Sequence, residues 1–258
     1  MSIKISGFSS TGGGGGGLPQ YGAVPAYYNI GNGIEEGNNN PAQVGFSSPG
    51  WGTTLFFVAS DRGANDNNDG YISYSGASEI NAAINGGAQY WEYVWASYLQ
   101  TQNPDGDSGI VATNAPILGR WIAISETLRS ADGATCPSYL ANYATTTSNN
   151  TVALTNNVTM NNGEFVVIAA GVEKGGGAIT SITTNSGLTW NRRSSKSHIP
   201  SSNNTVSDHQ TLEIWYAVND TGSDITEQIN INYSSQFDDQ AVVITTWSNV
   251  DPVTPWAN

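Results

Sequence analysis

The sequence has few of the residues from which catalytic and metal centres are most often built. Its 258 residues include one cysteine and two histidines. Cys136 alone can form neither an intrachain disulfide nor a cysteine-based metal site. We expect it to be a buried structural thiol, since an unpaired buried cysteine behaves as a small apolar residue. His198 and His209 have only Asp208 as a nearby carboxylate, so we interpret them as solvated loop residues.

Charged residues are also scarce, and most of them are acidic. They make up 11% of the chain, with 8 Lys and Arg against 21 Asp and Glu, a formal net charge of −13. Proteins that bind phosphate backbones need a basic patch. The one basic cluster, Arg192, Arg193 and Lys196, is too small to oppose this field. The composition therefore argues against nucleic acid and anionic membrane surfaces as partners.

Long hydrophobic runs are missing as well. No apolar stretch reaches transmembrane length, and the N-terminus lacks the apolar segment of a secretory signal peptide. We expect no membrane insertion. Residues 1–20 predict an N-terminal arm, in which a strand candidate at Ile3–Phe8 precedes a flexible linker at Gly12–Gly17. Such an arm can add a strand to the sheet of a neighbouring molecule. No Gly-Lys-Ser/Thr follows the glycines, which excludes a phosphate-binding loop.

What the chain does contain is a series of short apolar strands separated by polar turns. The central one is Gly163–Val172, whose near-continuous apolar run predicts a strand buried on both faces. A hairpin-type connection is expected at Asn185–Gly187. Further strands are predicted at Thr53–Ala59, Ile117–Leu128, Gln210–Val218 and Ala241–Trp247, and by the alternation of Ile229, Ile231 and Tyr233.

This pattern predicts a mainly β protein in three parts. The arm and linker are followed by a β-rich attachment domain at 21–149 and by an antiparallel β-sandwich or jelly roll at 150–258. The Thr145–Asn150 stretch is the expected boundary. One short aromatic helix is expected within 78–101, because Trp91, Val94 and Trp95 recur at helical spacing. A strand over Tyr90–Leu99 stays open, since aromatic residues also favour sheets.

Two further patterns concern functional sites, a calcium loop and a pair of catalytic carboxylates. The Asn- and Asp-rich stretch Asn65–Gly70 resembles a calcium loop in its alternation, although the residues at both ends of the pattern do not fit. If it bound calcium, the ligands would be Asp61, Asp66 and Asp69; otherwise it is a turn, and we expect no metal or cofactor. Paired carboxylates for glycoside hydrolysis cannot be selected from spacing alone. The available ones are Asp238-Asp239, Glu35-Glu36 and Glu92.

The second half of the chain resembles a β-sandwich module of phage structural proteins and bacterial surface proteins. The resemblance covers about residues 150–258 and rests on GEFVVIAAGV, TSITTNSGLTW, LEIWYAV and AVVITTWSNVDPVTPW. The residues at the pattern positions are Gly187, Leu188, Thr189, Trp190, Trp215, Tyr216, Ala217, Val250, Asp251 and Pro255. Asn249 stands where this module usually has glycine. The module normally continues beyond this point, so we expect a different closure or a longer polypeptide.

The resemblance implies a non-enzymatic phage virion protein, either a tail fibre or appendage or a capsid-exterior decoration. Its partners would be other virion proteins and a host-surface glycan. A fibre predicts a homotrimer, whereas a decoration protein is compatible with one to three copies. The alternative is a secreted or surface carbohydrate-binding protein of bacteria, with exposed Trp and Tyr stacking on sugars. A third hypothesis is a glycan hydrolase that carries the sandwich as an accessory.

Overall fold

The computed structural model describes residues 32–40, 42–60, 78–86, 91–112, 117–173, 178–198 and 210–257. Within these ranges the chain forms antiparallel strands and turns and contains no helix. The predicted mainly β fold is therefore confirmed. A search of the same ranges finds no helix with the length and apolar character needed to cross a membrane. The predicted strand at Ile3–Phe8 and linker at Gly12–Gly17 lie outside the described residues.

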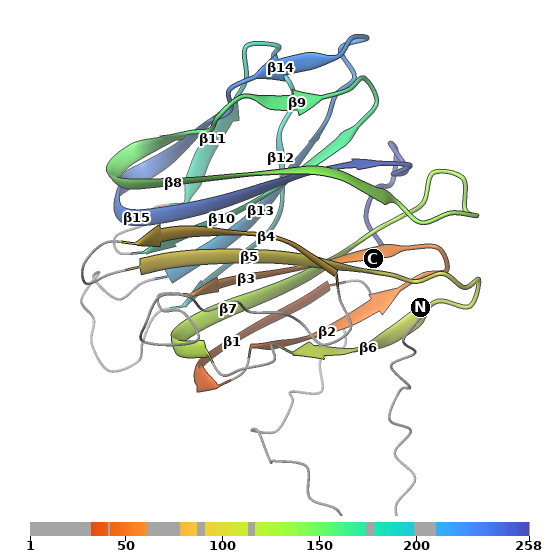
Figure 1. The fold of residues 1–258 in the computed structure, drawn as a ribbon, viewed down its shortest axis with the longest axis horizontal. Helices are drawn as coiled ribbons and strands as arrows, with labels where there is room; N and C mark the ends of the chain where they lie inside the picture. Colours follow the sequence, from red (N-terminus) through yellow and green to blue (C-terminus); the bar gives the residue numbers. More distant parts are fainter. Residues whose placement is uncertain are drawn as a thin grey trace, which may run out of the picture.

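The first half of the chain forms a five-stranded sheet, here called the first sheet. Its spatial order is β1 (Asn32–Asn40), β7 (Ile117–Leu128), β3 (Thr53–Ser60), β5 (Trp91–Gln100) and β4 (Ser78–Gly86). A separate pair, β2 (Gln43–Ser48) and β6 (Asp107–Ala112), lies below it (Figure 1). The Ser125 hydroxyl of β7 donates to the Gly45 carbonyl of β2 at 2.7 Å, which ties this pair to the outer face of the first sheet.

The second half forms the second sheet, above the first (Figure 1). Its strands are β12 (Asn191–His198), β13 (Gln210–Val218), β10 (Phe165–Glu173), β15 (Asn230–Ser248), β11 (Ile179–Thr183) and β8 (Ser138–Leu154). The long strand β15 pairs with β10 and β11 along one side and with β8 along the other. A short pair, β9 (Val158–Met160) and β14 (Ile225–Glu227), lies over the outer face.

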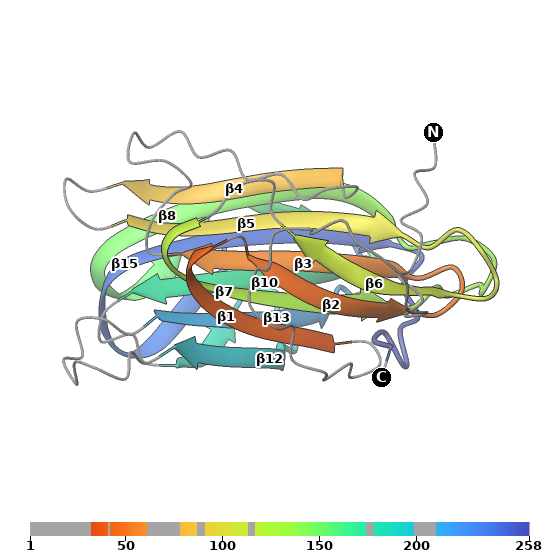
Figure 2. The same ribbon diagram turned by 90° about the horizontal axis from the view of Figure 1, so that it is seen from below.

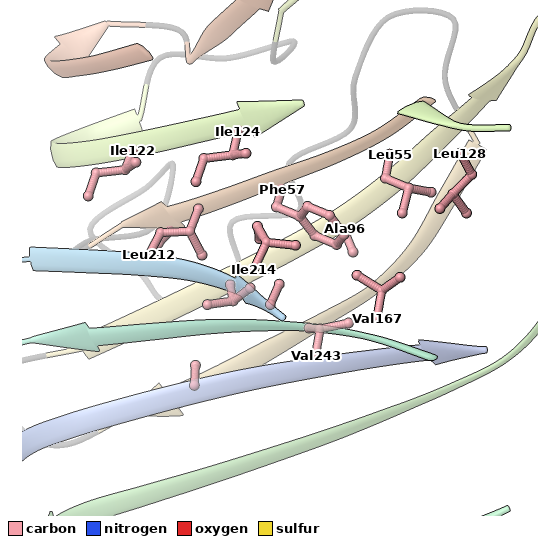
Figure 3. Packing of buried hydrophobic residues seen from close by; sticks show 14 of the residues in the cluster. Leu55, Phe57, Ala96, Ile122, Ile124, Leu128, Val167, Leu212, Ile214 and Val243 are labelled. Carbon is pink, nitrogen blue, oxygen red and sulfur yellow. The ribbon is translucent and has the colours of Figure 1, made fainter. Parts of the chain in front are cut away.

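The two sheets pack face to face around a shared apolar layer, here called the intersheet core. In Figure 3 side chains of β3, β5 and β7 meet side chains of β10, β13 and β15. Leu55 and Phe57 come from the first sheet, and Val167 and Ile214 from the second; all four are fully buried. Because the layer draws on both halves of the sequence, burial of one half depends on the other.

The central strand has the burial predicted for it. Phe165, Val167 and Ala169 of β10 face the intersheet core, whereas Val166 and Ile168 face a second apolar layer beneath β9 and β14, here called the outer core. This double burial explains why the strand reads as a continuous apolar run instead of an alternating one.

The turn before β10 depends on Gly163. Its φ of 84° lies in the left-handed region, where a Cβ atom is unfavourable. Its N–H donates to the Asn219 carbonyl at 2.7 Å, and this bond joins the turn to the end of β13. The turn residues Asn161, Asn162 and Gly163 therefore begin the central strand as their sequence predicts.

Two sequence predictions are wrong. The expected aromatic helix within 78–101 is the antiparallel strand pair β4 and β5, so the strand reading of Tyr90–Leu99 is correct. Val94 and Trp95 are buried on opposite faces of β5, in the intersheet core and toward β2, respectively. The predicted hairpin around Asn185–Gly187 is also absent: its flanking strands, β11 and β12, pair with β15 and β13 and do not pair with each other.

The predicted domain boundary at Thr145–Asn150 lies inside β8, which pairs with β15 on both sides of it. The division into an attachment domain and a display sandwich stays a prediction.

Farther along the chain, Asn249 has a φ of 56°. Asparagine tolerates this left-handed conformation better than most residues, which explains its presence at a position where the resembled module usually has glycine.

Candidate functional site

The arginines of the basic cluster point to opposite faces of β12. The pairing of β12 with β13 shifts register between Arg192 and Ser194, and such an irregularity can redirect a side chain. Arg193 reaches the intersheet core, where it meets Glu126 of β7 in the other sheet, and Arg192 meets Glu213 of β13 on the outer face. The sequence cluster is therefore divided between two buried carboxylates and does not form one basic patch.

Glu126 and Arg193 form an ion pair between the two sheets. The Arg193 Nε donates to Glu126 Oε2 at 2.8 Å, and the Glu126 side chain is fully buried. Arg193 also donates through Nη2 to the Ala257 carbonyl at 3.3 Å, and its guanidinium lies 5.3 Å from the ring centre of Trp256. The pair thus fastens β7, β12 and the C-terminal segment together.

Burial dominates the electrostatics of Glu126. It raises the pKa of this carboxyl above the ordinary value of 4.5, and the charge and hydrogen bond of Arg193, together with the Ser194 side chain, oppose the shift without cancelling it. The second oxygen, Oε1, is buried and has no hydrogen-bond partner within the described part of the chain. The ion pair therefore offsets only part of the desolvation of the carboxylate.

Trp256 closes this end of the sandwich. Its ring lies edge-on to Phe165 and to Tyr216, at 5.4 Å from each ring centre, and those two rings stack on each other at 5.3 Å. The backbone around it bonds to the end of β7: Arg129 N donates to the Pro255 carbonyl at 2.8 Å, and Ala257 N donates to the Thr127 carbonyl at 2.9 Å. The C-terminal segment is thus part of the core closure.

Glu213 has a different environment on the outer face of the second sheet. Its Oε2 accepts a hydrogen bond from Trp215 Nε1 at 2.8 Å, and its Oε1 accepts one from the Ile179 backbone N–H at 3.0 Å. Arg192 Nη1 lies 3.9 Å from Oε2, with about half of its side chain exposed. Both carboxylate oxygens are therefore satisfied, mostly from within the same sheet.

This outer face also presents two half-buried tryptophans. Trp190 and Trp215 pack against the outer core while part of each side chain reaches solvent. The exposed guanidinium of Arg192 lies opposite Trp215 in the strand register. Indole faces can stack on a flat ligand, and a guanidinium beside them can donate hydrogen bonds to it. Here the tryptophan–arginine face (Trp190, Arg192 and Trp215) is the candidate binding surface.

The candidate calcium ligands, Asp61, Asp66 and Asp69, lie outside the described residues, as do Asp208 and His209. His198 ends β12, and the structure describes only its backbone. Glu35, Glu36 and Glu92 lie in β1 and β5, far apart in the strand order of the first sheet. Where side chains are described, no three residues of the metal-binding types His, Cys, Asp and Glu converge.

Cys136 is buried, as expected, and its thiol donates to the Thr101 carbonyl at 3.4 Å. Burial raises the pKa of this thiol, and the negative charge of Asp132 raises it further. Since the thiolate is the reactive form, both effects reduce the reactivity of the cysteine at neutral pH.

The sequence analysis missed both buried glutamates, although a signal for them was present. Glu126 and Glu213 are the lone acidic residues within the apolar segments Ile117–Leu128 and Gln210–Val218. A carboxylate inside a buried strand needs a cationic or hydrogen-bonding partner. The two adjacent arginines of an otherwise basic-poor chain were the available partners.

The chain was compared with family models, curated proteins and solved structures, and none of them matches it.

Proposed function

We propose that this protein is a non-enzymatic structural component of a bacteriophage virion, a tail fibre or appendage or a capsid-exterior decoration. It is assembled in the host cytoplasm, joins other virion proteins through its N-terminal region and displays the β-sandwich outward toward the host surface. The proposal combines the resemblance of residues 150–258 to modules of phage structural proteins with the way the described side chains are used.

The observation that carries the proposal is that both described ion pairs link neighbouring strands or sheets of the fold. Arg193 joins Glu126 between the sheets, and Arg192 lies against buried Glu213. The described strands are also closed by apolar layers on both faces of the central strand. Such side chains hold the layers together, and a durable, weakly charged surface suits a protein whose task is to be displayed.

Immunogold labelling of intact particles tests the proposal. Val253 is 84% exposed at the tip of a turn, so a short epitope tag inserted after it would be accessible in the folded chain. We expect the tag to be labelled on purified, intact virions that carry the tagged protein. Disrupted particles serve as the control. If the protein is absent from both preparations, the proposal is wrong.

A second candidate function is carbohydrate binding by a secreted or surface protein of bacteria. The observation that favours it is the tryptophan–arginine face, because sugars stack on exposed indole rings and accept hydrogen bonds from guanidinium groups. A glycan array with the purified protein tests this function. Saturable binding that is lost in Trp215→Ala and retained in Trp51→Ala, a half-buried tryptophan of the first half of the chain, would favour it over the virion role.

A further inference from the structure

Strand β8 is a long sheet edge without charged residues. It runs for 17 residues, Ser138–Leu154, and contains no Asp, Glu, Lys, Arg, His, Pro or Gly. In the described fold it pairs with β15 on one side, and no described strand pairs with it on the other. It runs beside β4, the edge strand of the first sheet, which pairs with β5 (Figure 2). The two sheet edges therefore lie on one side of the sandwich.

The exposure of β8 differs from that of its partner. Every residue of β15 from Asp239 to Trp247 is buried, whereas none from Ser138 to Thr147 is. Leu140 is 44% exposed, one of two large apolar side chains that the described residues expose. β8 is rich in Thr and Tyr, which are typical of the interior strands of a sheet. It nevertheless lies at the edge, where it is half exposed over ten residues.

Other edge strands of the two sheets are either charged or, like β11 with its five residues, short, and both features protect an edge against pairing. Natural proteins place charged residues on exposed edges, because a bare edge is a template for another strand. β1 contains Glu35 and Glu36, β4 contains Glu79, and β12 contains Arg192 and Lys196. The contrast indicates that the edge of β8 is a pairing surface.

We propose that β8 pairs with β8 of a second copy of this chain, antiparallel and about a two-fold axis through Thr146. In this register several residues of similar size and polarity face each other. Thr145 faces Thr147, Ala144 faces Ser148, Asn142 faces Asn150 and Leu140 faces Val152 of the second copy. A two-fold axis repeats each pair of facing residues, so every favourable pair contributes twice to the stability of the dimer.

The charge of the chain does not prevent a second copy from pairing at this edge. Two chains that each carry a net charge of −13 repel one another, and like charges placed opposite each other destabilise strand pairing. β8 is free of ionisable groups except the phenols of Tyr139 and Tyr143, so that the self-pairing places no carboxylates face to face. The pairing would also cover the exposed Leu140 with Val152 of the second copy. This two-fold dimer differs from the homotrimer expected of a fibre.

A charge-swap experiment at the axis tests the register. Thr146 is exposed and meets its own copy, so Thr146→Lys and Thr146→Glu each place like charges together. We expect each variant alone to raise the dimer dissociation constant about fivefold or more. An equimolar mixture should restore dimers, because Lys then faces Glu. Thr183→Lys and Thr183→Glu, at an exposed position of β11, are the matched controls and should dimerise as the wild type does.

Sedimentation of the full chain over a range of concentrations gives the readout, with circular dichroism to check folding. A wild-type dimer that the Lys and Glu variants weaken and the mixture restores supports the pairing. A monomer at all concentrations, a trimer, or a dimer indifferent to the Thr146 variants would overturn it. The outcome is independent of virion labelling, since a dimer can form in a protein that is absent from particles, and the reverse.

Discussion

Glu126 and Glu213 are both buried glutamates paired with adjacent arginines, yet they are held in different ways. Glu213 is satisfied from its own sheet, by the Trp215 indole and the Ile179 backbone, and Arg192 adds a longer contact. Glu126 is held from the opposite sheet, by Arg193 and by the Ser194 side chain next to it in the sequence. The comparison teaches that a carboxylate within a sheet can be part of local structure, whereas one between sheets makes each sheet dependent on the other.

The largest expected effect is that of removing the arginine between the sheets. Arg193→Ala leaves the Glu126 carboxylate buried without its partner, and we expect it to reduce the free energy of unfolding by about 3–5 kcal/mol. Arg192→Ala is the matched control. Its side chain is half exposed and Glu213 keeps two other donors, so its loss should cost less than about 1 kcal/mol. Urea denaturation measures both; equal losses would contradict the comparison.

A smaller effect is expected from removing the indole donor of Glu213. Trp215→Phe keeps an aromatic ring in place and deletes the hydrogen bond to Glu213 Oε2. Because the backbone of Ile179 and the Arg192 guanidinium stay near the carboxylate, we expect a loss of about 1 kcal/mol. Thermal unfolding monitored by circular dichroism checks it. A loss as large as that of Arg193→Ala would show that Glu213 is not held by several independent donors.

The pH dependence of stability tests the burial of Glu126. Since the pKa of Glu126 is raised in the folded protein, its contribution to stability is fully present below about pH 4.5 and is lost as the pH rises through the folded pKa. Relative to Glu126→Gln, the wild type should therefore lose free energy of unfolding on going from pH 4 toward neutrality. Urea titrations at several pH values measure the difference. A difference that grows in favour of the wild type would refute the stated sign.

The smallest effect concerns reactivity. Burial and Asp132 both raise the pKa of Cys136, so the folded protein should react with a thiol reagent such as Ellman's reagent far more slowly than the chain in denaturant. Asp132→Asn removes one of the two causes and should speed the reaction only slightly, because burial is the larger one. A folded protein that reacts as fast as the denatured chain would show that the thiol is accessible.

Much of the fold was predictable from the sequence where a residue pattern is compatible with only one kind of secondary structure. The continuous apolar run of β10 and the alternation of Ile231 and Tyr233 in β15 predicted strands with the correct burial, and Ile229, which is also buried, directly precedes β15. The β4–β5 region was less decisive, because Trp91, Val94 and Trp95 fit helical spacing, whereas Val94 and Trp95 also fit a strand buried on both faces. Burial on both faces removes the alternation that would have separated the two.

Long-range pairing was not predictable in the same way. The turn at Asn185–Gly187 has hairpin residues, but β11 and β12 leave it for opposite sides of the second sheet. Likewise, nothing local to Glu126 indicates Arg193 as its partner, because the two residues lie 67 positions apart. Each pairing is selected by the packing of the two sheets, which a local sequence pattern does not contain.

The central claim is that the two sheets are one cooperative unit built around the intersheet core. Hydrogen exchange at increasing denaturant tests it most directly, by comparing the opening free energies of β3 in the first sheet and β10 in the second. The account predicts that amides of both strands exchange in one shared unfolding event with the same free energy and the same denaturant dependence. Separate events, with one sheet protected while the other is open, would contradict it.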